Sequence, residues 1–352
     1  MKKVKFCDVL EYEQPSKYIV ESNQYKEKYK IPVLTAGKSF ILGYTNETKG
    51  IYHATKDHPI ILFDDFTTDC RYIDFNFKVK SSAVKILKLK RNDNNLKYLY
   101  YILKNIVYDT SSHKRYWISQ YSNFEVRLPN IEIQNEIVKE MGKIEDLIGN
   151  KEKQIKKFDE LVKSQFVKMF ENKKYSKKCL IDVCEELFAG GDVKKEHTSK
   201  ERTDKYKYPI FTNGEKLDGL YGYTDIIRVD KEAVTISGRG TIGFSCIRNE
   251  PFYPAVRLIV AIPNKNIIDT IFLRQFIENK NYGGQGAGIP QLTVPMIKNE
   301  QISIPPIELQ KKFAKFVKQI DKKKEICNKI IDKLNELKKS KMQEYFGGAI
   351  NE

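Results

Sequence analysis

The sequence predicts an α+β fold in which two β-rich domains alternate with two long helices. The heptapeptide Leu-Pro-Asn-Ile-Glu-Ile-Gln recurs later in the chain as Ile-Pro-Pro-Ile-Glu-Leu-Gln. Its proline, Pro129, and the equivalent Pro305 are 176 positions apart, half of the 352 residues. Each copy opens about forty residues with helical spacing, and each follows short apolar runs bounded by Gly, Pro or Asp. A register shared over this length indicates an internal repeat.

Both copies carry the heptad pattern of a helix that packs along another helix, because apolar positions alternate in steps of four and three. In the first copy the pattern runs through Ile137, Met141, Ile144, Ile148, Lys151, Ile155, Phe158, Val162, Gln165 and Met169. In the second copy it runs through Phe313, Val317, Ile320, Lys324, Cys327, Ile331, Leu334, Lys338, Lys341 and Tyr345. The lysines weaken the apolar seam and can set its register or orientation. We expect an antiparallel coiled coil of the two copies, and not two unrelated surface helices.

The repeat divides the chain into four segments. They are a first β-rich domain (residues 1–128), a central helix (129–172), a second β-rich domain (173–304) and a C-terminal helix (305–348). Strands are predicted at residues 31–37, 60–63, 73–79, 208–214 and 233–236, and further helices at 96–107 and 268–279. The helices keep a strict register while the β-rich parts drift in sequence, so two related domains should present different surfaces.

Composition favours a folded protein with a polyanionic partner. The net charge is +16 and the pI is about 9.3, and aromatic residues make up 12% of the chain. A lysine-rich proteome would give the same excess, so the charge is informative only where it gathers on one face. The six Cys and four His show no metal-ligand spacing. With no recognisable signal peptide or membrane-spanning run, we expect a soluble cytosolic protein with free thiols.

A glycine-rich segment follows a predicted strand at residues 237–243 and contains Gly-x-Gly-x-x-Gly. A dinucleotide-binding loop of this kind must open a helix. Here the continuation at residues 244–248 is β-like, and Pro251 soon follows. We therefore predict a glycine-rich hairpin or turn that exposes Arg239.

Other motifs of enzymes are incomplete. Residues 249–252 read Asn-Glu-Pro-Phe, with Glu where an amino-methyltransferase motif needs its first proline, and residues 188–191 lack the spacing of a glycine-rich S-adenosylmethionine loop. Asp64 and Asp65 lack the Glu-x-Lys or Asp-x-Lys strand of a metal nuclease. We interpret them as a charged turn after a buried strand, although such carboxylates can also accept from cytosine. No catalytic residue, cofactor site or metal site is predicted in this chain.

Loops in both domains combine basic, aromatic and amide side chains, the chemistry that contacts duplex DNA. Arg and Lys bind guanine or phosphate, and Asn and Gln bind adenine. One such cluster is weak evidence because loops are generally polar, but their presence in both repeats favours DNA contact. The predicted DNA-binding residues are Lys38, Tyr44, Thr45, Asn46, Lys114, Arg115 and Tyr116 in the first domain, and Lys216, Tyr221, Tyr223, Arg239, Arg257 and Gln285 in the second.

With these features the chain resembles the specificity subunit of Type I restriction-modification systems. The resemblance rests on the two copies of the heptapeptide that begins each heptad helix, and on the domain-helix-domain-helix order. Local matches lie at residues 35–37, 43–46, 63–67, 115–119 and 236–243. It implies two target recognition domains, each reading one half of an asymmetric bipartite site, with the helices as the spacer between them.

The resemblance also implies partners. Two methyltransferase subunits and restriction subunits would join this chain on double-stranded DNA in the bacterial cytoplasm, away from any membrane. S-adenosylmethionine would bind to the methyltransferase, and ATP and Mg to the restriction subunit. One alternative is the specificity subunit of a methylation-only system. Others, from different classes, are a basic coiled-coil scaffold without sequence specificity and an enzyme that retains a cofactor at residues 238–243.

Overall fold

The computed structural model describes residues 2–36, 39–108, 114–171, 173–280, 282 and 291–348. The chain forms two compact units, one of Met1–Lys151 with Lys329–Glu352 and one of Glu152–Asn328. Helices α4 (Ile131–Phe166) and α7 (Ile307–Phe346) each contribute residues to both units. The units therefore cut across the four segments predicted from the sequence.

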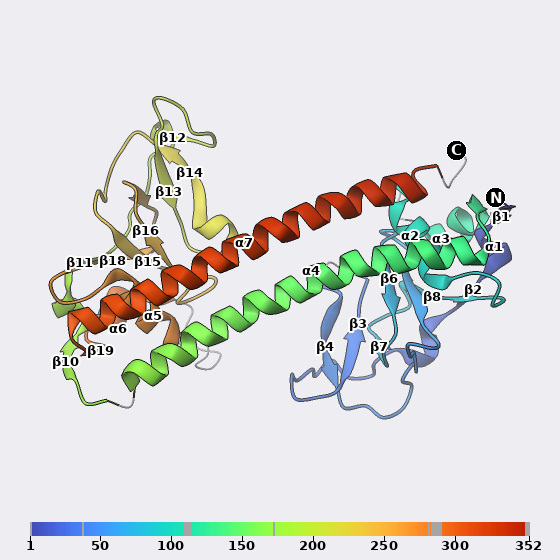
Figure 1. The fold of residues 1–352 in the computed structure, drawn as a ribbon, viewed down its shortest axis with the longest axis horizontal. Coiled ribbons are helices and arrows are strands. Elements are labelled where there is room, and N and C mark those ends of the chain that lie inside the picture. Colours follow the sequence, from blue (N-terminus) through green and yellow to red (C-terminus); the bar gives the residue numbers. More distant parts are fainter. Residues whose placement is uncertain are drawn as a thin grey trace. The chain divides into compact units, whose positions relative to one another are not determined.

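The first unit is built on small sheets covered by a helix (Figure 1). Its elements are β1 (Lys2–Lys5), α1 (Phe6–Val9), β2 (Leu10–Glu13), a 3-10 helix (Pro15–Tyr18), β3 (Ile31–Leu34), β4 (Ile41–Thr45), β5 (Ile60–Asp64), β6 (Cys70–Ile73), β7 (Lys78–Val79), β8 (Val84–Leu89), α2 (Leu96–Asn105), α3 (Tyr116–Ser119), a 3-10 helix (Tyr121–Asn123) and β9 (Glu125–Leu128). The strand orders are β2-β8-β5-β6, β4-β3-β7 and β1-β9, and only the β3–β7 pair among these strands is parallel.

The second unit repeats this plan. A π-helical turn (Val167–Glu171) ends α4, and the elements that follow are β10 (Ser176–Cys179), a 3-10 helix (Leu180–Val183), β11 (Cys184–Ala189), a 3-10 helix (Lys195–His197), β12 (Thr198–Ser199), β13 (Tyr208–Phe211), a 3-10 helix (Lys216–Gly219), β14 (Leu220–Thr224), β15 (Ala233–Ile236), β16 (Ser245–Arg248), β17 (Tyr253–Pro254), β18 (Ile259–Pro263), α5 (Thr270–Asn279), α6 (Val294–Ile297) and β19 (Gln301–Ile304). The strand orders are β11-β18-β15-β16, β12-β14-β13-β17 and β10-β19. Apart from the added edge strand β12, they match the first unit strand for strand, so the repeat extends to the sheets.

Strand β5 shows why the central strands are continuous apolar runs. Ile61 and Phe63 belong to the core that also contains the buried face of α2. Ile60 and Leu62, on the opposite face, belong to a second core with residues of β3 and β7. Because successive side chains of a strand point to opposite faces, a strand buried on both faces needs apolar residues at every position.

The strands predicted at residues 31–37, 60–63, 208–214 and 233–236 and the helices at 96–107 and 268–279 are present, with shorter ends in most cases. The prediction of a single strand at residues 73–79 is wrong. Its two ends belong to β6 and β7, which lie in different sheets, and Phe77 between them pairs with Tyr52. The alternation of apolar residues there reflects a crossing between sheets, not one half-buried strand.

The glutamine of the repeated heptapeptide joins each long helix to the helix of its domain. The buried Gln134 amide accepts from Asn95 N–H at 2.9 Å and donates to Pro129 O at 2.9 Å. Gln310 does the same with Asp269 N–H at 2.9 Å and Pro305 O at 2.8 Å. Since Asn95 and Asp269 are the N-caps of α2 and α5, the motif is repeated because it completes the same helix start twice.

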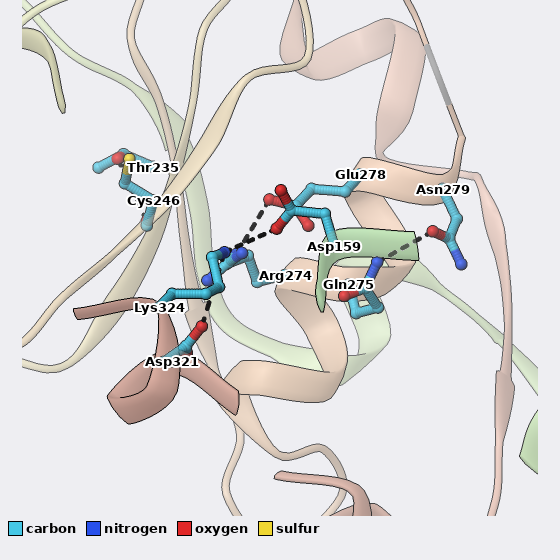
Figure 2. A network of polar contacts seen from close by, with 9 residues as sticks. All are labelled: Asp159, Thr235, Cys246, Arg274, Gln275, Glu278, Asn279, Asp321 and Lys324. Carbon is cyan, nitrogen blue, oxygen red and sulfur yellow. Dashed lines mark hydrogen bonds and ion pairs between the residues drawn. The ribbon is translucent and has the colours of Figure 1, made fainter. Parts of the chain in front are cut away.

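Helices α4 and α7 pair antiparallel, as predicted. All ten seam positions named for each copy are buried or half-buried. In the first unit Lys338 pairs with Glu145 at 2.9 Å and Lys341 with Glu140 at 3.3 Å. In the second unit, Lys324 pairs with Asp159 at 2.7 Å, next to the Arg274–Glu278 pair of α5 (Figure 2). Lys324, Lys338 and Lys341 thus carry ion pairs between the helices, which favour this register over its neighbours.

Candidate nucleic-acid interface

Three loops of the second unit meet at one side chain, Asn213. They follow β13 (residues 212–219), β15 (237–244) and β17 (255–258). The Asn213 Oδ1 atom accepts from Gly238 N–H at 2.7 Å, and its Nδ2 donates to the carbonyl of Val256 at 3.1 Å. The segment before α6 joins them, because Leu292 N–H donates to Gly238 O at 2.8 Å. We call this meeting point the Asn213 junction.

The glycine-rich segment is a turn between antiparallel strands, as predicted. Ser237 N–H donates to Phe244 O at 2.8 Å, and the chain continues into β16, which pairs with β15. Gly238 has no room for a side chain, since a Cβ would lie 2.7 Å from the carbonyl oxygens of both Arg257 and Leu292. The turn exposes Arg239 to solvent. It opens no helix, so it lacks the geometry of a dinucleotide-binding loop.

Backbone strain gathers in these loops. Of the four non-glycine residues with positive φ in the described part of the chain, Leu217, Asp218 and Arg257 lie here. The buried Arg248 holds the Leu217 turn by donating to Asp218 O, and its guanidinium lies 3.6 Å from the Phe211 ring centroid. Burial lowers the pKa of Arg248 from its ordinary value. Strained residues persist where the surroundings hold them, and such sites are frequently functional.

The first unit builds an equivalent junction around Asp65. Asp65 N–H donates to Ala83 O at 3.0 Å, and Asp65 O accepts from Tyr116 N–H at 2.9 Å, as Gly238 O accepts from Leu292. Its Oδ1 atom also accepts from Trp117 N–H at 2.8 Å. The Oδ2 atom lies 3.3 Å from the Nζ of Lys85, and both side chains are buried. We call this the Asp65 junction.

Asp64 and Asp65 therefore form the structural turn that was preferred from the sequence. The Asp64 carboxylate accepts from the N–H groups of Phe66 and Thr67 and from the Thr67 hydroxyl. Both aspartates are at least 96% buried, so their oxygens do not face a groove. Across the described residues, no cluster of three His, Cys, Asp or Glu side chains could hold a metal ion.

The predicted DNA-binding residues differ in how far they are exposed to solvent. Asn46, Lys114, Arg115, Lys216, Tyr221 and Arg239 are exposed, and Tyr44, Tyr223 and Arg257 are half-buried. Lys38 and Gln285 lie outside the described residues. The structure brings Arg239 and Arg257 together at the Asn213 junction and places Lys216 in one of its loops, and it places Lys114 and Arg115 directly before the Asp65 junction. Tyr221 and Tyr223 lie on strand β14.

Two of the predictions need correction. Thr45 is only 2% exposed, and its hydroxyl accepts from Glu47 N–H within the chain. Tyr116 is fully buried with its ring against Tyr108, so it belongs to the core. Neither side chain can reach a duplex in this structure. Both were predicted from polar or aromatic neighbours, which do not reveal the side of the chain that faces inward.

A family model described as the Type I restriction modification DNA specificity domain matches residues 1–157 and 172–336. The chain belongs to this family. The specificity subunit of a type I restriction enzyme from Escherichia coli is 48% identical over 146 residues, 39% of this chain and 36% of that protein. The chain thus spans about a third of that relative. A putative type I specificity subunit of Mycoplasma pneumoniae is 28% identical over 275 residues, 74% of each chain.

The fold is also that of a known specificity subunit. The crystal structure of the Type I restriction-modification S subunit from M. genitalium superposes with a TM-score of 0.56 at 16% identity, covering 98% of this chain and 96% of that one. The two matches to the specificity domain agree with the two strand-for-strand repeats. No helix among the described residues is long and apolar enough to cross a membrane.

Sequence reasoning missed two cations of the second specificity domain. Lys200 Nζ lies 4.1 Å from the ring centroid of Tyr221, and Arg202 Cζ lies 6.0 Å from that of Tyr223. These cations precede their aromatic partners by about twenty positions, so spacing gave no signal. With the two tyrosines they form a basic and aromatic strip along β14, a surface suited to phosphate and base contact.

Proposed function

We propose that this chain is a non-catalytic subunit that directs a Type I restriction-modification complex to its DNA target. Each specificity domain reads one half of a bipartite site. The observation that carries this proposal is the duplicated junction, which in each domain fixes loops bearing an exposed arginine, Arg115 or Arg239. An exposed arginine on a backbone held in this way suits bidentate contact with guanine.

The target is asymmetric in this proposal. The two junctions share a backbone hydrogen bond to the carbonyl of a residue just after the central strand. That residue is Asp65 in one and Gly238 in the other, and the cations around them differ. Domains with the same frame and different surface side chains should read different bases. The net charge of +16 adds affinity that does not depend on sequence.

The paired helices set the spacer between the half-sites. Helix α4 has 36 residues and α7 has 40. At a rise of about 1.5 Å per residue, 36 residues extend roughly 54 Å, more than the ~34 Å of one DNA turn. Inserting one heptad into each helix at matched positions should lengthen the spacer and leave both half-sites unchanged, as read from the methylated sites.

Catalysis resides in partner subunits. Two methyltransferase subunits bind this chain and carry S-adenosylmethionine, and restriction subunits carry ATP and Mg. The long helices still expose Leu147, Leu161, Ile326 and Leu337 outside their seam, each at least 45% exposed. Apolar side chains at these positions suit contact with partner helices.

Methylome sequencing of the host with and without the gene tests the proposal directly. We expect one bipartite, asymmetric adenine-methylation motif to disappear on deletion. Loss of no motif would contradict the proposal. A helicase-nuclease gene beside this one would indicate restriction, and its absence a methylation-only system. Equal binding of the purified complex to every duplex at moderate salt would instead indicate a basic scaffold.

A further inference from the structure

We infer that Asp65 and Lys85 are positioning residues of the first specificity domain, which hold the segment carrying Lys114 and Arg115 in its DNA-reading position. The inference rests on the proposed function and names residues that do not themselves touch DNA. Both lie in the core, and both are far in sequence from the segment they hold.

The hydrogen bonds converge on one residue. The backbone N–H groups of Tyr116 and Trp117 both donate to Asp65. Tyr116 donates to its carbonyl oxygen at 2.9 Å, and Trp117 donates to its carboxylate at 2.8 Å. Two successive bonds from a backbone fix its direction as well as its position. The two bonds hold the residues that directly follow Arg115, whose own side chain is exposed.

Lys85 fixes the carboxylate in turn. Its Nζ lies 3.3 Å from Asp65 Oδ2 and 5.6 Å from the Tyr12 ring centroid, and it is fully buried. The two charged atoms of the pair make no hydrogen bond of good geometry within the described structure. Their contact is therefore ionic, and it holds the Asp65 side chain so that Oδ1 faces Trp117.

Stability alone does not explain this pair. A buried ion pair is commonly no more stabilising than apolar residues of the same volume, because both charges lose water. One attested use of such pairs is to select one arrangement among several. Here the arrangement selected is the path of residues 114–117 across the end of β5.

The second specificity domain supports this interpretation because it forms the same junction with different side chains. At the equivalent position Gly238 has no carboxylate, and the amide of Asn213 joins the loops instead. Two domains that keep the junction with unrelated chemistry indicate that the junction itself is needed.

The test uses two double variants of the full chain. D65N/K85M removes both charges but keeps an amide oxygen that can accept from Trp117 N–H. D65A/K85M removes the charges and the acceptor. K88M/E13Q is the matched control, since Lys88 and Glu13 form a 2.9 Å ion pair between β8 and β2 of the same sheet, away from the junction.

Two readouts separate positioning from general stability. The first is the affinity of the complex for cognate duplex against duplexes altered in either half-site. D65A/K85M should lose about tenfold of its discrimination at the first half-site and keep it at the second. D65N/K85M can still accept from Trp117 N–H but has lost the contact with Lys85, so it should lose about threefold at the first half-site. K88M/E13Q should keep wild-type discrimination at both half-sites. The second readout is the emission of Trp117, the single Trp of the chain, which should shift to longer wavelength only in D65A/K85M.

Several outcomes overturn the inference. They are wild-type discrimination in D65A/K85M or in D65N/K85M, equal loss at both half-sites, or a loss in K88M/E13Q as large as that in D65A/K85M. If D65A/K85M does not fold, D65S/K85M replaces it with the same expectation, because the shorter hydroxyl does not reach Trp117 N–H. Failure of the proposed function is distinguishable, because the wild-type complex itself would then show no discrimination at either half-site.

Discussion

The two junctions solve the same structural problem with different chemistry. Both join the loop after the central strand, β5 or β15, to the segment that leads into a short helix, α3 or α6. The Asp65 junction uses a buried ion pair, whereas the Asn213 junction uses a neutral amide and a glycine with no space for a side chain. The backbone frame is therefore shared, while the side chains that fix it are free to differ.

This difference predicts unequal sensitivity to single substitutions. Asp65→Ala leaves the Lys85 ammonium buried without a counter-charge and should lower the free energy of unfolding by about 3–5 kcal/mol. Asn213→Ala removes two neutral hydrogen bonds and should cost about 1–3 kcal/mol. Chemical denaturation of each variant, followed by circular dichroism, measures both. Equal losses would mean that the ionic character of the Asp65 junction is unimportant.

Glycine substitutions test how closely the Asn213 junction is packed. Gly238→Ala would place a Cβ 2.7 Å from two carbonyl oxygens, and should cost about 1–3 kcal/mol with loss of second half-site recognition. Gly240→Ala, in the same turn, has open space and only a positive φ of 68° to accommodate. It should cost about 1 kcal/mol and leave recognition intact. Thermal denaturation and duplex binding separate the two; a harmless Gly238→Ala would show that the loops can separate without consequence.

The exposed arginines should act on separate half-sites. Arg115→Ala and Arg239→Ala should each lower affinity for the cognate duplex by about 1–3 kcal/mol if the residue reads a base. Each should relax preference only at its own half of the target. Binding to a panel of altered duplexes measures this. Uniform weakening over all sequences would assign the residue to phosphate contact.

Lowering the pH should reduce the stability of the first unit, because Glu145 of the helix seam becomes protonated. Burial acts to raise the pKa of Glu145, but hydrogen bonds from Lys338 and Lys97 outweigh it and hold the pKa below its ordinary value of 4.5. A lowered pKa in the folded state gives stability that is complete above the unfolded pKa and is lost as pH falls through the folded pKa. Below about pH 4.5, wild type should therefore lose more of its unfolding free energy than Glu145→Gln does in urea titrations. Identical acid sensitivity of the two proteins would contradict this.

The smallest effect expected is a gain in stability. Leu217 has φ 51° and ψ 36° with 73% of its surface exposed. Asn and Gly adopt this conformation at lower cost than Leu. Leu217→Asn should raise the unfolding free energy by about 0.5–1 kcal/mol, as measured by thermal denaturation, with Leu42→Asn as an exposed control on a strand. A loss of stability would mean that the Leu217 turn is relaxed.

The sequence by itself determined the repeat, the short helix and the long helix that accompany each domain, and the antiparallel seam. These features depend on local periodicity, since a heptad pattern places the same face of a helix inward wherever the partner comes from. The glycine-rich turn and the exposure of Arg239 were also predictable, because the strand that follows excludes a helix start.

Only the tertiary structure decided what each loop residue does. Asp65, Lys85 and Trp117 are 20 and 32 positions apart in turn, and no local pattern links them. For the same reason, the sequence could single out Gln134 by its repetition without revealing that it completes the start of α2. Thr45 and Tyr116 were assigned to the surface by their neighbours, yet packing turned both inward. Periodicity fixes which face of a regular element is buried, but in a loop the long-range contacts make that choice.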